Sequence, residues 1–159
     1  MIPIKNGKLQ KHGVAFSLPE GFCYNSDPEC VHENGIEFVS EDENKVLDYD
    51  FLTSEEKSFD ALNVLFKEDF LGYHNFRKLT PITPILFNGL LGHHVLYKGD
   101  DSPDEPATQY YELNIDLCEC EDGYLLFSLR INVLDGDIMS YVETDEFKRL
   151  LANISTVEE

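Results

Sequence analysis

The dipeptide Asn88-Gly89, placed between two apolar runs, constrains the fold of this chain more than any other feature of its sequence. Both residues accept positive φ angles, so the pair favours the two-residue turn of a β-hairpin. A turn at this position predicts three cross-strand pairs: Thr83 with His94, Leu86 with Leu91 and Phe87 with Leu90. The segment 82–97 therefore predicts two antiparallel strands with a defined register.

The predicted hairpin is apolar on both of its faces. One face carries Ile82, Leu86, Leu91, His93, Val95 and Tyr97, and the other carries Ile85, Phe87, Leu90, His94 and Leu96. A sheet with two apolar faces needs helices or long connections packed above and below it. Pro81 and Pro84 cannot donate backbone hydrogen bonds, which suits a strand at the edge of the sheet.

A second hairpin is predicted around the sequence "CECEDG". The odd-numbered residues are apolar from Tyr111 to Leu117 and from Leu125 to Val133, so both strands must turn them to one face. A three-residue loop, Glu121-Asp122-Gly123, meets this condition if Gly123 has a positive φ in a bulge, whereas a two-residue turn at Asp122-Gly123 does not. The predicted pairs are Leu117 with Phe127, Ile115 with Leu129, Cys118 with Leu126, Cys120 with Tyr124 and Asn114 with Arg130.

The first half of the chain predicts three more strands. The segment "HGVAFSLPEGF" alternates in hydrophobicity and then breaks at Pro19-Glu20-Gly21, which indicates a strand followed by a turn. The segment 35–51 predicts a hairpin around the acidic turn 41–44. Its second strand should place Leu47, Tyr49 and Phe51 on one buried face.

Two helices are predicted. Thr53 and Glu56 have the spacing of a capping box, and apolar residues at helical spacing follow, so we expect a helix over 54–71. A second helix over 145–155 should begin near Thr144. Its buried stripe would consist of Phe147, Leu150, Leu151 and Ile154. The 159 residues fit a single domain over 1–159, with both helices packed on an antiparallel sheet in an α/β (α+β) fold.

The charge of the chain restricts its partners. Lysine and arginine number 12 and aspartate and glutamate number 31, which gives a formal net charge of −19. Such a charge repels nucleic acid and anionic membrane surfaces, so neither is expected as a partner. No run approaches the roughly 18 apolar residues of a membrane span, and the first residues lack the apolar segment of a signal peptide. We therefore expect a cytoplasmic protein.

One acidic stretch is the candidate partner-binding site. Between Gly99 and Asp122 there is no basic residue, and nine residues are acidic: Asp100, Asp101, Asp104, Glu105, Glu112, Asp116, Glu119, Glu121 and Asp122. We predict that Asp100, Asp101, Asp104 and Glu105, in the loop 99–108, steer a protein with a basic surface toward the sheet. The alternative is that these charges only keep the protein soluble.

Cys118 and Cys120 raise the question of a metal site. A tetrahedral zinc ion needs about four ligands, usually from C-x2-C pairs, and the C-x-C spacing suits a single ion poorly. His93 and His94 are adjacent on a strand, so at most one of them can join the cysteines. We expect no metal and no cofactor, and we expect Cys23 and Cys30 to be reduced thiols. The alternative is a small metal-dependent protein or enzyme that uses Cys118, Cys120 and one histidine.

Catalytic motifs are absent from the sequence. It contains no G-x-S-x-G, no G-x-x-x-x-G-K, no H-E-x-x-H and no G-x-G-x-x-G. No catalytic residue is therefore assigned, and we expect that the chain is not an enzyme.

The order of elements resembles that of the PsbP-like domains. The resemblance lies in the turn "FSLPEGF" (16–22), the succession of hairpins around one helix, and the terminal helix "EFKRLLANIS" (146–155). This group includes the photosystem subunit PsbP, a Ran-binding nuclear transport factor, DcrB-type bacterial proteins and the Eag chaperones of type VI secretion. The resemblance implies an antiparallel sheet sandwiched between helices in three α/β/α layers, and a domain that binds other proteins. It carries over no functional residue.

These observations together predict a non-catalytic protein-binding domain. A cytoplasmic chaperone and an immunity-type adaptor both fit the resemblance, the charge and the absence of catalytic motifs.

Overall fold

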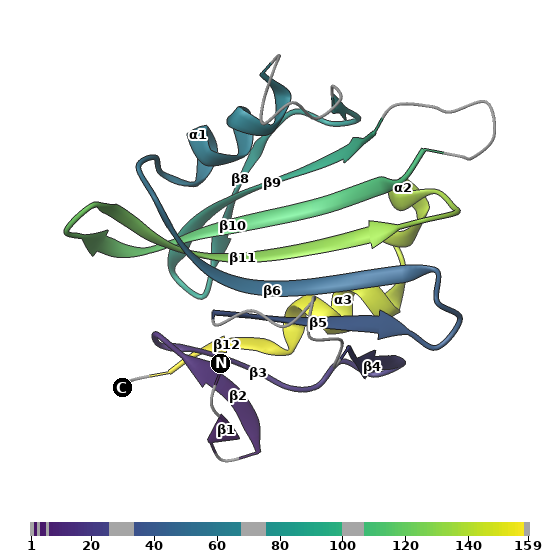
Figure 1. The fold of residues 1–159 in the computed structure, drawn as a ribbon, viewed down its shortest axis with the longest axis horizontal. Helices are drawn as coiled ribbons and strands as arrows, with labels where there is room; N and C mark the ends of the chain where they lie inside the picture. Colours follow the sequence, from purple (N-terminus) through teal and green to yellow (C-terminus); the bar gives the residue numbers. More distant parts are fainter. Residues whose placement is uncertain are drawn as a thin grey trace.

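The computed structural model describes residues 2, 4–5, 7–25, 34–67, 76–99 and 107–157. The described strands form two antiparallel sheets (Figure 1). The large sheet has the order β4 (Phe22–Tyr24), β5 (Gly35–Ser40), β6 (Lys45–Ser54), β11 (Gly123–Val133), β10 (Gln109–Cys120), β9 (Leu90–Lys98) and β7 (Arg77–Lys78). Strand β8 (Thr83–Phe87) also pairs with β9. The small sheet has the order β1 (Ile4–Lys5), β2 (Lys8–Lys11), β3 (Val14–Phe16) and β12 (Ile154–Thr156).

Short helical segments accompany the described strands. Helix α1 (Ser58–Asn63) continues into the 3-10 turn η1 (Val64–Phe66), and α2 (Ile138–Tyr141) precedes α3 (Asp145–Ala152). Thr144 caps α3, because its hydroxyl accepts a hydrogen bond from the Phe147 amide at 3.3 Å. The predicted start of this helix is therefore confirmed. The helix ends at Ala152, so Ile154 is buried in β12 and not on the helix.

The main core lies on the inner face of the large sheet, the face of Leu47, Tyr49 and Phe127. The small sheet and the helices α2 and α3 cover this face, because their apolar side chains belong to the same cluster. Phe16 of β3 stacks on Tyr49 of β6 with 4.1 Å between the ring centroids. Alternation along each strand sends one apolar residue in two into this core, as predicted for Leu47, Tyr49 and Phe51.

The opposite, outer face of the large sheet has a smaller cluster. Leu62 of α1 packs with Val95 and Tyr97 of β9, so α1 and η1 cover the β9 and β10 side. Among the described residues, no helix lies over the outer face of β5 and β6 (Figure 1). The structure therefore confirms an antiparallel sheet with helices in an α+β fold. The predicted three-layer α/β/α sandwich is not confirmed, since helical cover of the outer face is partial.

The Asn88-Gly89 hairpin forms as predicted. Asn88 has φ of 50° and Gly89 has φ of 85°. Thr83 pairs with His94, Leu86 with Leu91 and Phe87 with Leu90. Leu96 packs into the main core and Val95 into the outer cluster, which confirms that β9 is covered on both faces. Strand β8 lies at the sheet edge, where its proline is tolerated.

The register of the β10–β11 hairpin differs from the prediction. The turn consists of Glu121 and Asp122 alone, because Cys120 pairs with Gly123. The extra residue is Leu117, where the register shifts between Asp116 and Cys118. The observed pairs are Ile115 with Phe127, Leu113 with Leu129, Glu112 with Arg130, Asn114 with Ser128 and Cys118 with Leu125. The alternation of apolar residues requires one extra residue in the hairpin but does not specify its position. The predicted register was wrong because it placed this residue in the loop and not at Leu117.

Gly123 nevertheless has the predicted positive φ, at 139°. A Cβ atom at this position would collide with the Ser54 carbonyl oxygen. The backbone of β11 therefore approaches that of β6 at a point where only glycine fits.

The predicted helix over 54–71 is wrong at its start. Thr53 and Ser54 belong to β6, because this strand pairs with β11 as far as Ser54 and Tyr124. Helix α1 begins at Ser58, and its N-cap residue Lys57 makes no side-chain cap. Residues 68–71 lie outside the described part of the chain.

Candidate functional site

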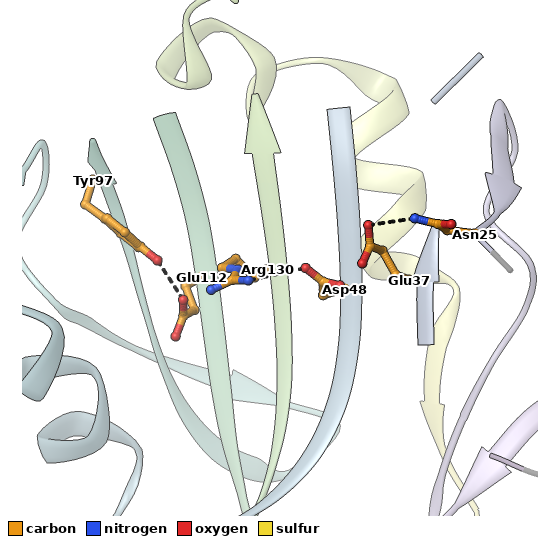
Figure 2. A network of polar contacts seen from close by, with 6 residues as sticks. All are labelled: Asn25, Glu37, Asp48, Tyr97, Glu112 and Arg130. Atoms are coloured by element: carbon orange, nitrogen blue, oxygen red, sulfur yellow. Dashed lines mark hydrogen bonds and ion pairs between the residues drawn. The ribbon is translucent and has the colours of Figure 1, made fainter. Parts of the chain in front are cut away.

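A row of polar side chains crosses the outer face of the large sheet. It contains Tyr97 of β9, Glu112 of β10, Arg130 of β11, Asp48 of β6, Glu37 of β5 and Asn25, which follows β4 (Figure 2). Glu112 pairs with Arg130, Arg130 with Asp48 and Asp48 with Glu37 in the strand register. These four residues thus occupy neighbouring positions on adjacent strands, and side-chain hydrogen bonds add Tyr97 at one end and Asn25 at the other. We call the six residues the polar row.

Contacts within the polar row link its members in pairs. The Tyr97 hydroxyl donates a hydrogen bond to Glu112 Oε1 at 2.7 Å, and Arg130 Nη2 lies 3.4 Å from Asp48 Oδ2. At the other end, Asn25 Nδ2 donates to Glu37 Oε1 at 3.1 Å (Figure 2). The Arg130 side chain is 44% exposed and Asp48 is 21% exposed, so their ion pair is open to solvent and stabilises the fold little.

Glu112 is the most buried carboxyl group of the polar row. Its burial raises its pKa, and the negative charge of Asp48 adds to this effect. The hydrogen bond from Tyr97 and the charge of Arg130 act in the opposite direction. Burial also raises the pKa of Tyr97, as does the neighbouring charge of Glu112, so the phenol remains protonated and donates.

A cavity of about 210 Å³ lies beside the polar row. Its polar lining consists of Asp48, Asp50, Glu112, Ser128 and Arg130, with Tyr49 and Leu52 completing the wall. Within the described part of the chain, three carboxyl groups thus share this cavity with a single guanidinium group. We call it the acidic cavity. Its described lining has more acidic than basic side chains.

Two asparagine side chains on the same face have unused hydrogen-bonding capacity. Asn114 Oδ1 and Asn132 Oδ1 are buried and have no hydrogen-bond partner among the residues that the structure describes. Asn114 is only 4% exposed and pairs across the strands with Ser128, which lines the acidic cavity.

The predicted partner-binding residues are not part of this site. Asp100, Asp101, Asp104 and Glu105 all lie outside the described residues, so their role stays a prediction. Asp116, from the same acidic stretch, has a structural role instead. Its carboxylate accepts hydrogen bonds from the Ser58 amide at 2.9 Å and the Ser58 hydroxyl at 3.0 Å.

The described cysteines and histidines do not form a cluster. Cys23, Cys118 and Cys120 are exposed free thiols, and Cys30 lies outside the described residues. His93 Nδ1 lies 2.7 Å from the Ser58 hydroxyl on the outer face, and His94 Nδ1 lies 3.0 Å from the Tyr111 hydroxyl on the inner face. Across 7–25, 34–67, 76–99 and 107–157, no three His, Cys, Asp or Glu residues are placed to share a metal ion.

The polar row was missed by the sequence reasoning because it depends on the register of β10 and β11. The assumed register placed Asn114 opposite Arg130, whereas the observed register places Glu112 there. A charged residue at an outer-face position of each of four strands is the signal that would have located it: Glu37, Asp48, Glu112 and Arg130. That signal becomes visible only after the strands are aligned.

Comparisons with known proteins identify the fold but no family. No family model and no curated protein sequence matches the chain. Among solved structures, the chain is similar to a point mutant of the protein Mog1, with 13% identity, a TM-score of 0.56 and 92% of each chain covered. It is also similar to LpqN, involved in cell envelope biogenesis of Mycobacterium tuberculosis, with 9% identity and a TM-score of 0.59. That match covers 91% of this chain and 83% of LpqN.

These similarities support the Mog1 and PsbP-like fold group, as the order of elements indicated. The identities are too low to carry a function across. No helix among the described residues has the length and apolar character needed to cross a membrane.

Proposed function

We propose that the chain is a non-catalytic protein-binding domain whose partner presents a basic segment to the outer face of the large sheet. The polar row and the acidic cavity would receive this segment. A cytoplasmic chaperone and an immunity-type adaptor are the two roles that fit such a domain.

The acidic cavity is the observation that carries the proposal. Asp48, Asp50 and Glu112 line it from two strands, and Arg130 is the one basic residue among the described residues of its lining. The described lining thus has more acidic than basic side chains, which suits a lysine or arginine side chain of a partner. The net charge of −19 would add a long-range attraction for the same basic surface.

The form of the sheet around the cavity also supports binding. In the described part of the chain, α1 and η1 contact the outer face at β9 and β10, and Figure 1 shows no described helix over β5 and β6. Leu52 and Val46 of β6 are half-buried on this face beside the carboxylates. Apolar side chains next to an acidic cavity suit a protein partner, whose interfaces combine an apolar centre with polar groups around it.

One hydroxyl on this face that lies beside a histidine, that of Ser58, is engaged in the fold. Ser58 is fully buried, and its hydroxyl is hydrogen-bonded to both His93 and Asp116. A hydroxyl held in this way between two partners has no access to a substrate. We therefore do not assign Ser58 a catalytic role.

The proposal is tested by neutralising the acidic cavity and measuring partner capture. The variant carries Asp48→Asn and Asp50→Asn, and the control carries Glu121→Gln and Asp122→Asn at the exposed hairpin tip, so both lose two charges. Cross-linking of each protein in a lysate of its host, followed by mass spectrometry, identifies the partner. We expect the control to retain the partner of the unmodified protein and the cavity variant to bind it about 10-fold more weakly, since each charge pair contributes on the order of 1 kcal/mol. Equal capture by both variants would contradict the proposal.

A further inference from the structure

A separate pocket lies on the other side of the large sheet from the polar row. It occupies about 280 Å³ between β9 and β10 on one side and the α2–α3 segment on the other. Its walls include His94, Leu96, Tyr111, Val142, Phe147 and Leu151. We call it the His94 pocket. Its volume is close to the lower end of the range for small-molecule sites, roughly 300 Å³.

The walls of the His94 pocket exclude a charged occupant. No aspartate, glutamate, lysine or arginine is among its lining residues, all of which belong to the described chain. A charged molecule entering it would lose hydration without gaining an ionic partner. The occupant that fits this lining is therefore uncharged and mainly apolar.

Aromatic edges shape one wall of the pocket. Tyr111 and Phe147 meet edge to face, with ring centroids 4.8 Å apart and an interplanar angle of 81°. His94 and Tyr111 form a second such pair at 5.6 Å and 84°. A flat aromatic molecule would extend this series of edge-to-face contacts.

His94 provides a hydrogen-bonding group in the apolar wall. Burial lowers the pKa of His94, and the nearby His93 lowers it further, so the imidazole is neutral at pH 7. The hydrogen bond of His94 to Tyr111 runs through Nδ1 at 3.0 Å. Nε2 is hydrogen-bonded to none of the described residues and is the nitrogen left for a ligand.

The tautomer of His94 decides what Nε2 requires. If the Tyr111 hydroxyl donates to Nδ1, Nε2 carries the proton and donates; if Nδ1 donates to Tyr111, Nε2 accepts. A ligand hydroxyl can hydrogen-bond to Nε2 in either tautomer, because a hydroxyl both donates and accepts. Thr83 adds a second polar contact, because its hydroxyl donates to the Pro81 carbonyl at 3.0 Å and keeps its lone pairs for a ligand proton.

We propose that the His94 pocket is a binding site for a small uncharged aromatic molecule with one hydroxyl group, which His94 Nε2 hydrogen-bonds. This site is independent of the protein-binding face, since the two lie on opposite faces of the large sheet.

Three naphthalene probes test this proposal. 2-Naphthol carries the hydroxyl, naphthalene lacks it, and 2-naphthoate carries a charge in its place. Binding is followed by chemical shifts of the Leu96, Val142 and Leu151 methyl groups and quantified by calorimetry. We expect 2-naphthol to bind about 3- to 10-fold more tightly than naphthalene, which is the usual value of one hydrogen bond, and 2-naphthoate to bind more weakly than both.

Two variants assign the binding to the pocket. His94→Phe keeps an aromatic ring but removes Nε2, so 2-naphthol and naphthalene should bind it equally. Leu151→Trp fills the pocket from α3 and should abolish binding of all three probes. Glu121→Gln, at the exposed hairpin tip, is the control and should bind the probes as the unmodified protein does. A one-dimensional proton spectrum and the melting temperature confirm that each variant is folded.

The proposal is overturned by any of three results. The first is no methyl shift with 2-naphthol at its solubility limit. The second is equal affinity of the folded unmodified protein for 2-naphthol and naphthalene. The third is retention of binding in folded Leu151→Trp, which would place the probe outside the His94 pocket. This result tests the location of the probe even if His94→Phe does not fold.

Discussion

The Asp116 carboxylate in β10 accepts two hydrogen bonds from Ser58, the first residue of α1. One comes from the Ser58 amide at 2.9 Å and the other from its hydroxyl at 3.0 Å. Since the serine hydroxyl has a single proton and gives it to Asp116, His93 Nδ1 donates to the Ser58 oxygen at 2.7 Å. Asp116 therefore caps α1 from another element of the fold, in place of the local cap that Lys57 does not supply.

The first prediction concerns this cap. Asp116→Ala should lower the free energy of unfolding by about 1–2 kcal/mol, since it leaves the α1 amide and the buried Ser58 hydroxyl without their acceptor. Asp122→Asn at the exposed hairpin tip is the control and should change stability by less than about 0.5 kcal/mol. Urea denaturation measures both. Equal stability of the two variants would show that the cap contributes nothing.

The second prediction compares two glycines with positive φ. Gly123→Ala should cost about 2 kcal/mol or more, because the new Cβ meets the Ser54 carbonyl oxygen as well as an unfavourable φ of 139°. Gly89→Ala should cost only about 1 kcal/mol, because its φ is 85° but no atom lies within 4 Å of the new Cβ. Thermal denaturation distinguishes the two costs. A Gly89 variant as unstable as the Gly123 variant would contradict the close approach of β11 to β6.

The third prediction concerns the pH dependence that Glu112 imposes. Its pKa in the folded protein is raised above the ordinary value of 4.5, chiefly by burial. The folded state therefore holds this proton more tightly than the unfolded state, and the contribution of Glu112 to stability falls as pH rises above 4.5. Glu112→Gln cannot ionise, so its stability relative to the unmodified protein should increase between pH 4 and pH 7. A stability difference that stays constant with pH would contradict the raised pKa.

The fourth prediction is that Cys118 and Cys120 bind no structural metal. Both thiols are exposed at the end of β10, and neither His93 nor His94 reaches them in a shared cluster of described residues. Treatment with EDTA should leave the melting temperature unchanged, since removing a structural zinc ion would cost the fold much of its stability. Stoichiometric zinc that survives gel filtration and is lost in Cys118→Ser would contradict this prediction.

The parts of the fold that the sequence predicted are those decided by neighbouring residues. The turn chemistry of Asn88-Gly89 sets the β8–β9 register. Thr144 starts α3 because its hydroxyl accepts a hydrogen bond from the amide of Phe147, three residues further along the chain. The start of α1 was missed because β6 pairs up to Ser54 with β11, a strand far away in the sequence. This distant pairing outweighs the local capping signal of Thr53.

The candidate site was missed for a related reason. Glu37, Asp48, Glu112 and Arg130 each look like an ordinary solvent-facing residue within their own strands. Only the place of the extra residue, Leu117, decides that Glu112 and not Asn114 meets Arg130. Alternation of apolar residues specifies which face a residue lies on, but not which partner it has across the strands.

The last prediction separates the acidic loop from the acidic cavity. Asp100, Asp101, Asp104 and Glu105 lie in a segment without basic residues, and exposed charges that attract a partner act mainly on the rate of association. The carboxylates of Asp48 and Asp50 line a cavity, where contacts formed after docking act mainly on dissociation. Once the partner is identified, neutralising the four loop residues should slow association several-fold at low salt and leave the dissociation rate unchanged. Asp48→Asn with Asp50→Asn should instead speed dissociation. If stopped-flow measurements show that the loop variant associates as fast as the unmodified protein at every salt concentration, the loop charges serve solubility alone.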